Sequence, residues 1–239
     1  MLKASAIVVL VCFRYNIHMR FDVLSLFPHT LDAYYTSSIL GRAQKKKIIT
    51  VANHDMRQWA GNKHNRVDDT PYGGGPGMVI RVDVVHRALK SIYKRKSAAT
   101  RVILLTPRGR TFDQRIAKRL TRYRRLILIA GRYEAIDARI DHFVDEKISL
   151  GNFVLTGGEL AAACVVDSVS RLLPGVLGDS ASLASESFSS FDRGRVNVEY
   201  PQYTRPETYE GHRVPTFLLS GNHGSIAAWR ARKLKSKQV

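Results

Sequence analysis

The fold is decided by residues 150–171, LGNFVLTGGELAAACVVDSVSR. The short apolar piece Phe153–Leu155 predicts a strand, and Thr156-Gly157-Gly158 predicts a turn. A helix is predicted to follow, because apolar residues recur there at helical spacing. Since glycine has no Cβ, the turn can bring bare backbone N–H and C=O groups against a ligand. Asp167 and Arg171 are four residues apart on this helix and therefore share one face.

The residues of this stretch leave two interpretations open. A backbone-lined pocket followed by an ordered Asp/Arg pair indicates a small-molecule site beside a charged reaction centre. A tight turn, a core helix and a surface ion pair would produce the same pattern. In either case the apolar face of the predicted helix consists of Leu160, Cys164, Val165, Val169 and Leu172.

Composition and charge limit the class of protein. The 239 residues are enough for one or two domains, and 44% hydrophobic with 24% charged residues is typical of a soluble globular chain. Lys and Arg number 38 against 20 Asp and Glu, which gives a formal net charge of +18. Nucleic acid is the commonest polyanionic partner for such a chain, and an acidic membrane surface is the second. The sequence has no apolar run as long as a transmembrane helix, so we expect no membrane span.

Several standard sites are absent from the sequence. Cys12 and Cys164 lie in apolar runs without metal or redox spacing, which fits a reducing cytoplasm. The glycine-rich segment 73–77 spells neither a dinucleotide fingerprint nor a Walker phosphate loop, and HExxH, CxxC and nucleophile-elbow motifs are missing. These absences argue against a nucleophilic or metal-hydrolytic enzyme, and no metal ligands are predicted.

Strand and helix patterns alternate along the middle of the chain. Strands are predicted over 19–27, 48–52, 101–105 and 126–130, and helices over 30–47, 82–94 and 112–123, the last opened by a capping box of Thr111 and Gln114. This alternation predicts an α/β fold with a parallel sheet. Loops bearing Gly or Pro follow Leu105, Ala130 and Leu150, at the strand ends where open α/β sheets bind ligands.

Composition also predicts the organisation of the chain. Residues 1–18 are interpreted as an N-terminal extension, with an extra strand as the alternative, and residues 19–177 as the main domain. Serine-rich residues 178–199 predict a flexible linker. Residues 200–239 predict a small second unit, with a strand over 214–219 and a basic helix containing Trp229. The polar, glycine-rich loop 56–78 is either a flexible surface loop or a substrate contact, in which case Gly77 is a candidate.

A co-linear series of motifs resembles a known family, the bacterial tRNA (guanine-N1)-methyltransferases of the TrmD type. The resemblance covers Met19 to about Trp229. The motifs are YGGGPGM (72–78), TPRG (106–109), GRYEAID (131–137), LGNFVLTGGEL (150–160), DSVSRLLPGVLG (167–178), YPQYTRPE (200–207) and LLSGNH (218–223).

The resemblance implies a knotted, SPOUT-type α/β fold in which three strand-end loops form a deep trefoil knot, with a small helical unit at the C-terminus. It implies S-adenosylmethionine as methyl donor, a tRNA anticodon stem-loop as substrate, and a homodimer with its sites at the subunit interface. By match to the family, the donor-binding residues would be Leu105, Pro107, Gly131, Tyr133, Glu134, Leu150, Gly151, Asn152, Phe153, Val154, Leu155, Gly157 and Gly158. An apolar strand end offers an adenine edge dry backbone donors and acceptors, which agrees with that assignment.

The resemblance also implies catalytic roles. Arg171 matches the family's arginine that stabilises charge on guanine O6, and Asp167 is expected to position it. The family's general base is an aspartate in a D-S-F sequence of the linker. Here the matching residue is Glu186, in Glu186-Ser187-Phe188, so the carboxylate is one methylene longer. Glu199 matches an acidic position that contacts the target base.

The family usually continues into a longer C-terminal helical domain, so the tRNA-binding unit of this chain is expected to be shortened. Two other functions compete with the implied one, which is methylation of the guanosine immediately 3′ of the anticodon. A knotted 2′-O-ribose methyltransferase would share the donor pocket without needing a linker carboxylate as base. A non-catalytic RNA-binding protein would use the basic charge but would bind no donor.

Overall fold

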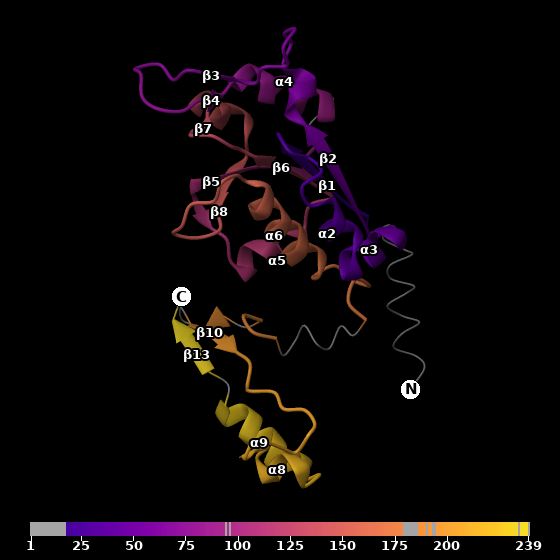
Figure 1. The fold of residues 1–239 in the computed structure, drawn as a ribbon. Coiled ribbons are helices and arrows are strands. Elements are labelled where there is room, and N and C mark those ends of the chain that lie inside the picture. Colours follow the sequence, from indigo (N-terminus) through magenta and orange to yellow (C-terminus); the bar gives the residue numbers. More distant parts are fainter. Residues whose placement is uncertain are drawn as a thin grey trace. The chain divides into compact units, whose positions relative to one another are not determined.

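The computed structural model describes residues 18–93, 95, 97–178, 186–189, 191–192, 195–233 and 235–238. The N-terminal extension predicted over residues 1–18 lies outside the described residues except for His18. The chain divides after Gly178 into two compact units. Figure 1 shows the elements of each unit.

A five-stranded parallel sheet forms the centre of the first unit, which confirms the predicted α/β class. Its strand order is β2-β1-β6-β5-β8, and each neighbouring pair is parallel. The strands are β1 (Met19–Ser25), β2 (Ile49–Asp55), β5 (Thr100–Thr111), β6 (Arg125–Ala130) and β8 (Glu146–Ser149).

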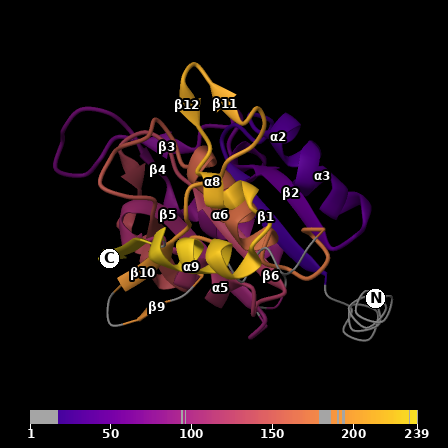
Figure 2. The same ribbon diagram turned by 90° about the horizontal axis from the view of Figure 1, so that it is seen from below.

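Helices cover both faces of the sheet. One face carries α2 (Asp32–Thr36), α3 (Ser38–Lys45), α5 (Gln114–Leu120) and α6 (Glu159–Ser170). The other carries α4 (Val82–Ile92) with the 3-10 helices η1 (Met56–Trp59) and η2 (Ala138–Phe143). Figures 1 and 2 show α2 and α3 beside β1 and β2, and Figure 1 shows α4 across the sheet from α5 and α6.

The central strand β6 shows why these residues form a sheet covered on both sides. Leu126 and Leu128 pack into the core below α5 and α6, whereas Ile127 and Ile129 pack into the core below α4. All four are fully buried. A strand buried on both faces has a continuous apolar sequence instead of an alternating one.

A small second sheet pairs the end of the glycine-rich loop with the segment that follows β6. It contains β3 (Asp68–Asp69), β4 (Val79–Ile80) and β7 (Ala135–Ile136), with β4 and β7 parallel. The pairing continues at Glu134, whose backbone N–H donates to Met78 O at 3.1 Å. Gly77 lies beside it with φ +80, and a Cβ there would be 2.5 Å from Glu134 Cγ. The positive φ favours glycine at this position, and a side chain there would also displace that of Glu134.

Two helix predictions differ from the structure. The helix predicted over 30–47 is broken at Ser37, which has extended backbone (φ −94, ψ 165), so that α2 and α3 are separate. The apolar residues continue at helical spacing from α2 into α3, because both helices bury side chains in the same core. The capping box of Thr111 and Gln114 is wrong: Thr111 ends β5, and the cap of α5 is Asp113, whose Oδ1 accepts from Ile116 N at 2.8 Å.

The deciding stretch of the sequence folds differently from the prediction in two respects. Phe153–Leu155 is a loop and not a strand, and the strand before the turn is β8. The predicted apolar face of α6 is also partly wrong, because Leu160 and Cys164 are exposed. The buried face instead consists of Ala161, Ala162, Ala163, Val165, Val166, Val169 and Ser170, together with Glu159. Much of this buried face consists of alanine side chains, which give only a weak hydrophobic pattern in the sequence.

The second unit is built around Trp229. This residue of α9 (His223–Lys233) is 5% exposed, and its ring centroid lies 5.5–6.3 Å from those of Tyr200, Tyr203 and Phe217. The other elements are β9 (Phe191–Asp192), β10 (Arg195–Val198), β11 (Thr208–Tyr209), β12 (His212–Arg213), α8 (Thr216–Leu219) and β13 (Lys235–Gln238).

Two of these elements differ from the sequence-based expectation. The strand predicted over 214–219 is wrong, since these residues include α8. β10 lies within the range predicted as linker, where it pairs with β9 and β13. Its buried Val196 lies between polar neighbours, a period of two that the serine-rich composition of the segment obscured.

Candidate functional site

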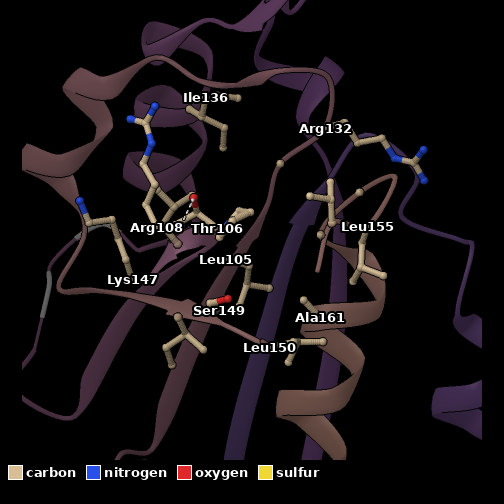
Figure 3. Close-up of a pocket in the computed structure, with 18 of the residues that line it drawn as sticks. Leu105, Thr106, Arg108, Arg132, Ile136, Lys147, Ser149, Leu150, Leu155 and Ala161 are labelled. Atoms are coloured by element: carbon tan, nitrogen blue, oxygen red, sulfur yellow. Dashed lines mark hydrogen bonds between the residues drawn. The ribbon is translucent and has the colours of Figure 1, made fainter. Parts of the chain in front are cut away.

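A cavity of about 290 Å³ opens at the carboxyl ends of β5, β6 and β8 in the first unit. Figure 3 shows side chains from the loops after all three strands and from α6 around it. This volume is at the lower end of the range for small-molecule sites. The lining residues are Leu104, Leu105, Thr106, Pro107, Arg108, Gly131, Arg132, Tyr133, Glu134, Ala135, Ile136, Ala138, Ile140, Asp141, Lys147, Ile148, Ser149, Leu150, Phe153, Val154, Leu155, Thr156, Gly157, Gly158 and Ala161.

The first loop of the cavity interrupts β5. Leu105 and Arg110 both pair with Ile148 of β8, so residues 106–109 bulge out of the strand between them. Gly109 passes directly over β8: a Cβ there would be 2.4 Å from Ile148 N. The glycine of the TPRG motif is therefore required by strand packing, and the bulge places Thr106, Pro107 and Arg108 in the cavity wall.

The second loop follows β6 and is held in a rarely adopted conformation. Tyr133 has φ +61, in the left-handed region that few non-glycine residues occupy, and its side chain is about half exposed. The β4–β7 pairing and the Glu134–Met78 hydrogen bond fix the backbone on its far side. A strained backbone conformation is kept when the structure around it holds it in place, and such conformations are frequent at ligand-binding sites.

The third loop joins β8 to α6 and packs its glycines against the second loop. Gly158 N donates to Gly131 O at 2.8 Å, and a Cβ on Gly158 would be 2.7 Å from Ala130 Cα. Position 158 therefore needs glycine because the backbones of the second and third loops meet there. The sequence pattern did not indicate this packing. The apolar side chains of Phe153 and Val154 are 55% and 85% exposed, so the cavity mouth has an unusually apolar surface.

The structure brings together most of the residues that the resemblance assigned to the donor. All of them line the cavity except Gly151 and Asn152, which lie on the third loop outside the lining set. Sequence reasoning missed the wall made by Ile136, Ala138 and Ile140. This wall depends on the β4–β7 pairing and on η2, and the nearest sequence signal is the end of the GRYEAID motif.

The catalytic candidates are distributed over both units. Asp167 lies on α6 six residues beyond Ala161, about 9 Å along the helix axis from the cavity wall, and Arg171 caps the C-terminal end of the same helix. Tyr34 Oη from α2 donates a hydrogen bond to the Asp167 carboxylate. That bond raises the pKa of the Tyr34 hydroxyl to about 12, with burial contributing in the same direction.

The second unit carries Glu186 and Glu199, and both are attached to one turn. Asn197 Nδ2 donates to Glu186 O at 2.9 Å, and Phe188 N donates to Asn197 O at 2.7 Å. Glu199 N in turn donates to Ser187 Oγ at 3.0 Å. The Glu-Ser-Phe motif is thus a turn fastened to β10, and not a free stretch of linker.

The described ranges contain neither a metal-binding cluster nor a membrane-spanning helix. No cluster of three or more His, Cys, Asp or Glu side chains suited to a metal ion occurs among those residues. None of their helices combines the length and the apolar character needed to cross a membrane.

The structure is that of an α/β protein with a cavity at the carboxyl ends of parallel strands. The model of the tRNA (Guanine-1)-methyltransferase TrmD family matches residues 19–239, and the chain belongs to this family. This confirms the resemblance that the motifs indicated.

Curated relatives agree with the family assignment, and each of the following is named tRNA (guanine-N(1)-)-methyltransferase. The protein of Rhodopirellula baltica is 47% identical over 223 residues, which cover 92% of this chain and 91% of the relative. That of Citrifermentans bemidjiense is 49% identical over 216 residues, covering 90% and 84%. That of Chloroflexus aggregans is 50% identical over 213 residues, covering 89% and 81%.

Proposed function

We propose that this chain is a cytoplasmic enzyme that transfers a methyl group from S-adenosylmethionine to N1 of a guanine in tRNA, at the guanosine immediately 3′ of the anticodon. Membership of the family and the names of the relatives support the reaction. The observation that carries the donor assignment is the cavity at the three strand ends, which the matched residues line. The net charge of +18 suits a polyanionic substrate.

The cavity offers both kinds of contact that an adenosine group requires. Leu105, Leu150 and Ile136 supply apolar walls, and the loop backbones around Gly131 and Gly157 supply hydrogen-bonding groups. A largely backbone-built pocket is formed before the ligand arrives, so we expect the donor to bind without RNA.

The reaction requires a base and a stabilising cation. Guanine N1 carries a proton, so a carboxylate must accept that proton as the N1–methyl bond forms and the donor's sulfur–methyl bond breaks. We assign this role to Glu186. Negative charge then develops toward O6, where the guanidinium of Arg171 would stabilise it, with Asp167 positioning the arginine. Gly77 and Glu199 are assigned to the target guanine.

We also propose a homodimer with its sites at the subunit interface. The exposed side of α6 supports this, since Leu160 is 54% exposed and Cys164 is exposed one turn further along. Tyr34, 47% exposed, lies against the same helix through its bond to Asp167. Exposed apolar surface of this kind is typical of association sites. We expect sedimentation equilibrium to give twice the chain mass, whereas a mass of one chain at micromolar concentration would refute the dimer.

A trefoil knot formed by the three cavity loops is part of the same proposal. The bulge of β5 across Ile148 and the packing of Gly158 on Ala130 support it, because both bring loop backbones into close contact. The path of these loops in a crystal structure would test it.

Donor binding tests the site directly. At about 100 times its dissociation constant, S-adenosylmethionine should stabilise the folded protein by roughly 2.7 kcal/mol, because it binds the folded and not the unfolded chain. Thermal unfolding with and without the donor measures this effect, and a nucleotide lacking the methionine part serves as control. A folded sample whose unfolding is unchanged by the donor and by its demethylated product would contradict the donor site.

A further inference from the structure

A partly buried ion pair joins two of the three cavity loops. Glu159, the first residue of α6, has a side chain that is 7% exposed, and its carboxylate pairs with Arg132 Nε at 3.2 Å. Ser25 Oγ, at the end of β1, donates to the same carboxylate at 2.6 Å. Arg132 belongs to the second loop, and Glu159 directly follows the glycines of the third.

The residues around the ion pair leave room for it and contact it. A Cβ on Gly157 would be 2.6 Å from Arg132 Nε and 2.4 Å from Glu159 Oε2, so the ion pair occupies the space that a side chain at residue 157 would need. The Arg132 guanidinium also lies 4.4 Å from the centroid of the Phe27 ring, a cation–π contact. In Figure 3 the Arg132 side chain extends outward, away from Leu105 and Ser149 in the middle of the cavity.

Stability is a weak reason for such a pair. Removing two charges from water costs free energy that their attraction returns only when the geometry is good, and well-packed apolar residues often do as well. The location of the pair points to a role at the cavity. The flanking residues Gly131, Tyr133 and Gly158 are all in the cavity wall, and the Gly158–Gly131 hydrogen bond joins the same two loops.

We propose that Arg132 and Glu159 are positioning residues that lock the second and third loops at the spacing that the methyl donor requires. This inference rests on the proposed donor site. Arg132 lines the cavity, but its guanidinium extends away from the middle of it, so the pair is expected to act through the loop backbones. Breaking it should therefore loosen the pocket and weaken donor binding, while the chemical step at saturating donor should change little.

The test compares Glu159→Gln, Arg132→Gln and the double variant with wild type. Arg87→Gln is the matched control, since Arg87 pairs with Asp83 on α4 at 2.8 Å, half exposed and outside the cavity wall. We expect each single variant to weaken donor binding on the order of tenfold, measured by calorimetry. Glu159→Gln, at a residue outside the cavity wall, should keep kcat at saturating donor within about threefold of wild type. The double variant should be weaker by less than the product of the two effects, as contacting residues require.

Hydrogen exchange provides a readout that does not depend on the donor. Amides of residues 131–134 and 157–158 should exchange faster in all three cavity variants than in wild type or Arg87→Gln, with and without donor. If these amides keep their exchange rates, or donor affinity stays within twofold while global stability falls, the pair is structural and the inference is wrong. Absence of donor binding in wild type would refute the proposed donor site instead, and the exchange rates would still decide whether the pair holds the loops.

Discussion

Glu186→Gln is expected to slow single-turnover methylation of tRNA by ~10²–10⁴-fold, the usual contribution of a general base. Glutamine keeps the size and polarity of the side chain but cannot accept the N1 proton at neutral pH. The turn that carries the residue should keep its bond to β10, because Asn197 Nδ2 donates to the backbone oxygen of Glu186, which the substitution does not change. Rapid-quench measurement with enzyme in excess would give the rate of the chemical step.

Several variants make this experiment specific. Glu186→Asp restores the commoner family residue and should keep substantial activity. Glu207→Gln is the matched control, since Glu207 is an exposed carboxylate of the same unit that pairs with Arg213 at 2.7 Å. Donor affinity should be nearly unchanged in Glu186→Gln, because the cavity that we assign to the donor is lined by residues of the first unit.

The competing base is Asp167. Its carboxylate already accepts a hydrogen bond from Tyr34, which favours a positioning role. If Glu186→Gln remains within about threefold of wild type while Asp167→Asn is inactive with donor still bound, the base is Asp167 and the assignment of the linker motif is wrong. Arg171→Lys should also be slow, since an ammonium cannot reproduce the planar donors of the guanidinium.

Asp22→Asn is expected to lower the free energy of unfolding by about 3 kcal/mol, at the lower end of the cost of breaking a buried pair. The Asp22 side chain, on β1 beside the central strand β6, is fully buried and contacts Arg125 Nε at 2.7 Å, His54 Nε2 at 2.7 Å and Arg20 Nη2 at 2.9 Å. Asparagine would leave this cluster of donors without its anion. Because the arginines are partly exposed, water can compensate for some of the loss.

The same cluster predicts a pH dependence. Burial works to raise the pKa of Asp22, but the hydrogen bonds from His54, Arg20 and Arg125 outweigh it and hold the pKa well below the usual carboxyl range. A lowered pKa in the folded state contributes stability that is complete above the ordinary carboxyl value near ~4 and is lost as the pH falls below it. Wild type should therefore lose stability more steeply than Asp22→Asn on acidification below about pH 4.

A control variant separates burial from pairing. Asp83 also contacts two arginines, Arg81 and Arg87, but its side chain is 42% exposed. Asp83→Asn should cost no more than about 1 kcal/mol, as is usual for exposed pairs. Urea unfolding of the three proteins measures the difference. Equal losses for Asp22→Asn and Asp83→Asn would show that the buried cluster has no special importance.

Patterns of apolar residues predicted four strands of the central sheet, β1, β2, β5 and β6, but gave no strand range for β8. The run Leu126–Ala130 is apolar throughout because both faces of β6 are covered, and the Gly- and Pro-bearing loops marked the correct edge of the sheet. Local signals failed where packing decides the conformation. Phe153–Leu155 has the composition of a strand but forms the cavity mouth, where its side chains remain exposed.

The cavity residues that were predicted lie within the recognised sequence motifs or directly beside them. The wall formed by Ile136 and η2 depends on pairing between β4 and β7, which are more than fifty residues apart in the sequence, so no short pattern predicts it. The Arg132–Glu159 pair was missed for the same reason. In the sequence each residue is an ordinary charge beside a glycine, and their burial becomes evident only when the two loops meet.

The central claim is that this chain methylates N1 of a guanine in tRNA. The most direct measurement is to incubate unmodified tRNA with the protein and S-adenosylmethionine, digest the RNA and identify the methylated nucleoside by mass spectrometry. We predict 1-methylguanosine at the position immediately 3′ of the anticodon, and none when that guanosine is replaced. A 2′-O-methylated nucleoside would contradict the account in favour of a ribose methyltransferase, and an RNA that binds tightly but gains no methyl group would contradict it in favour of a non-catalytic RNA-binding protein.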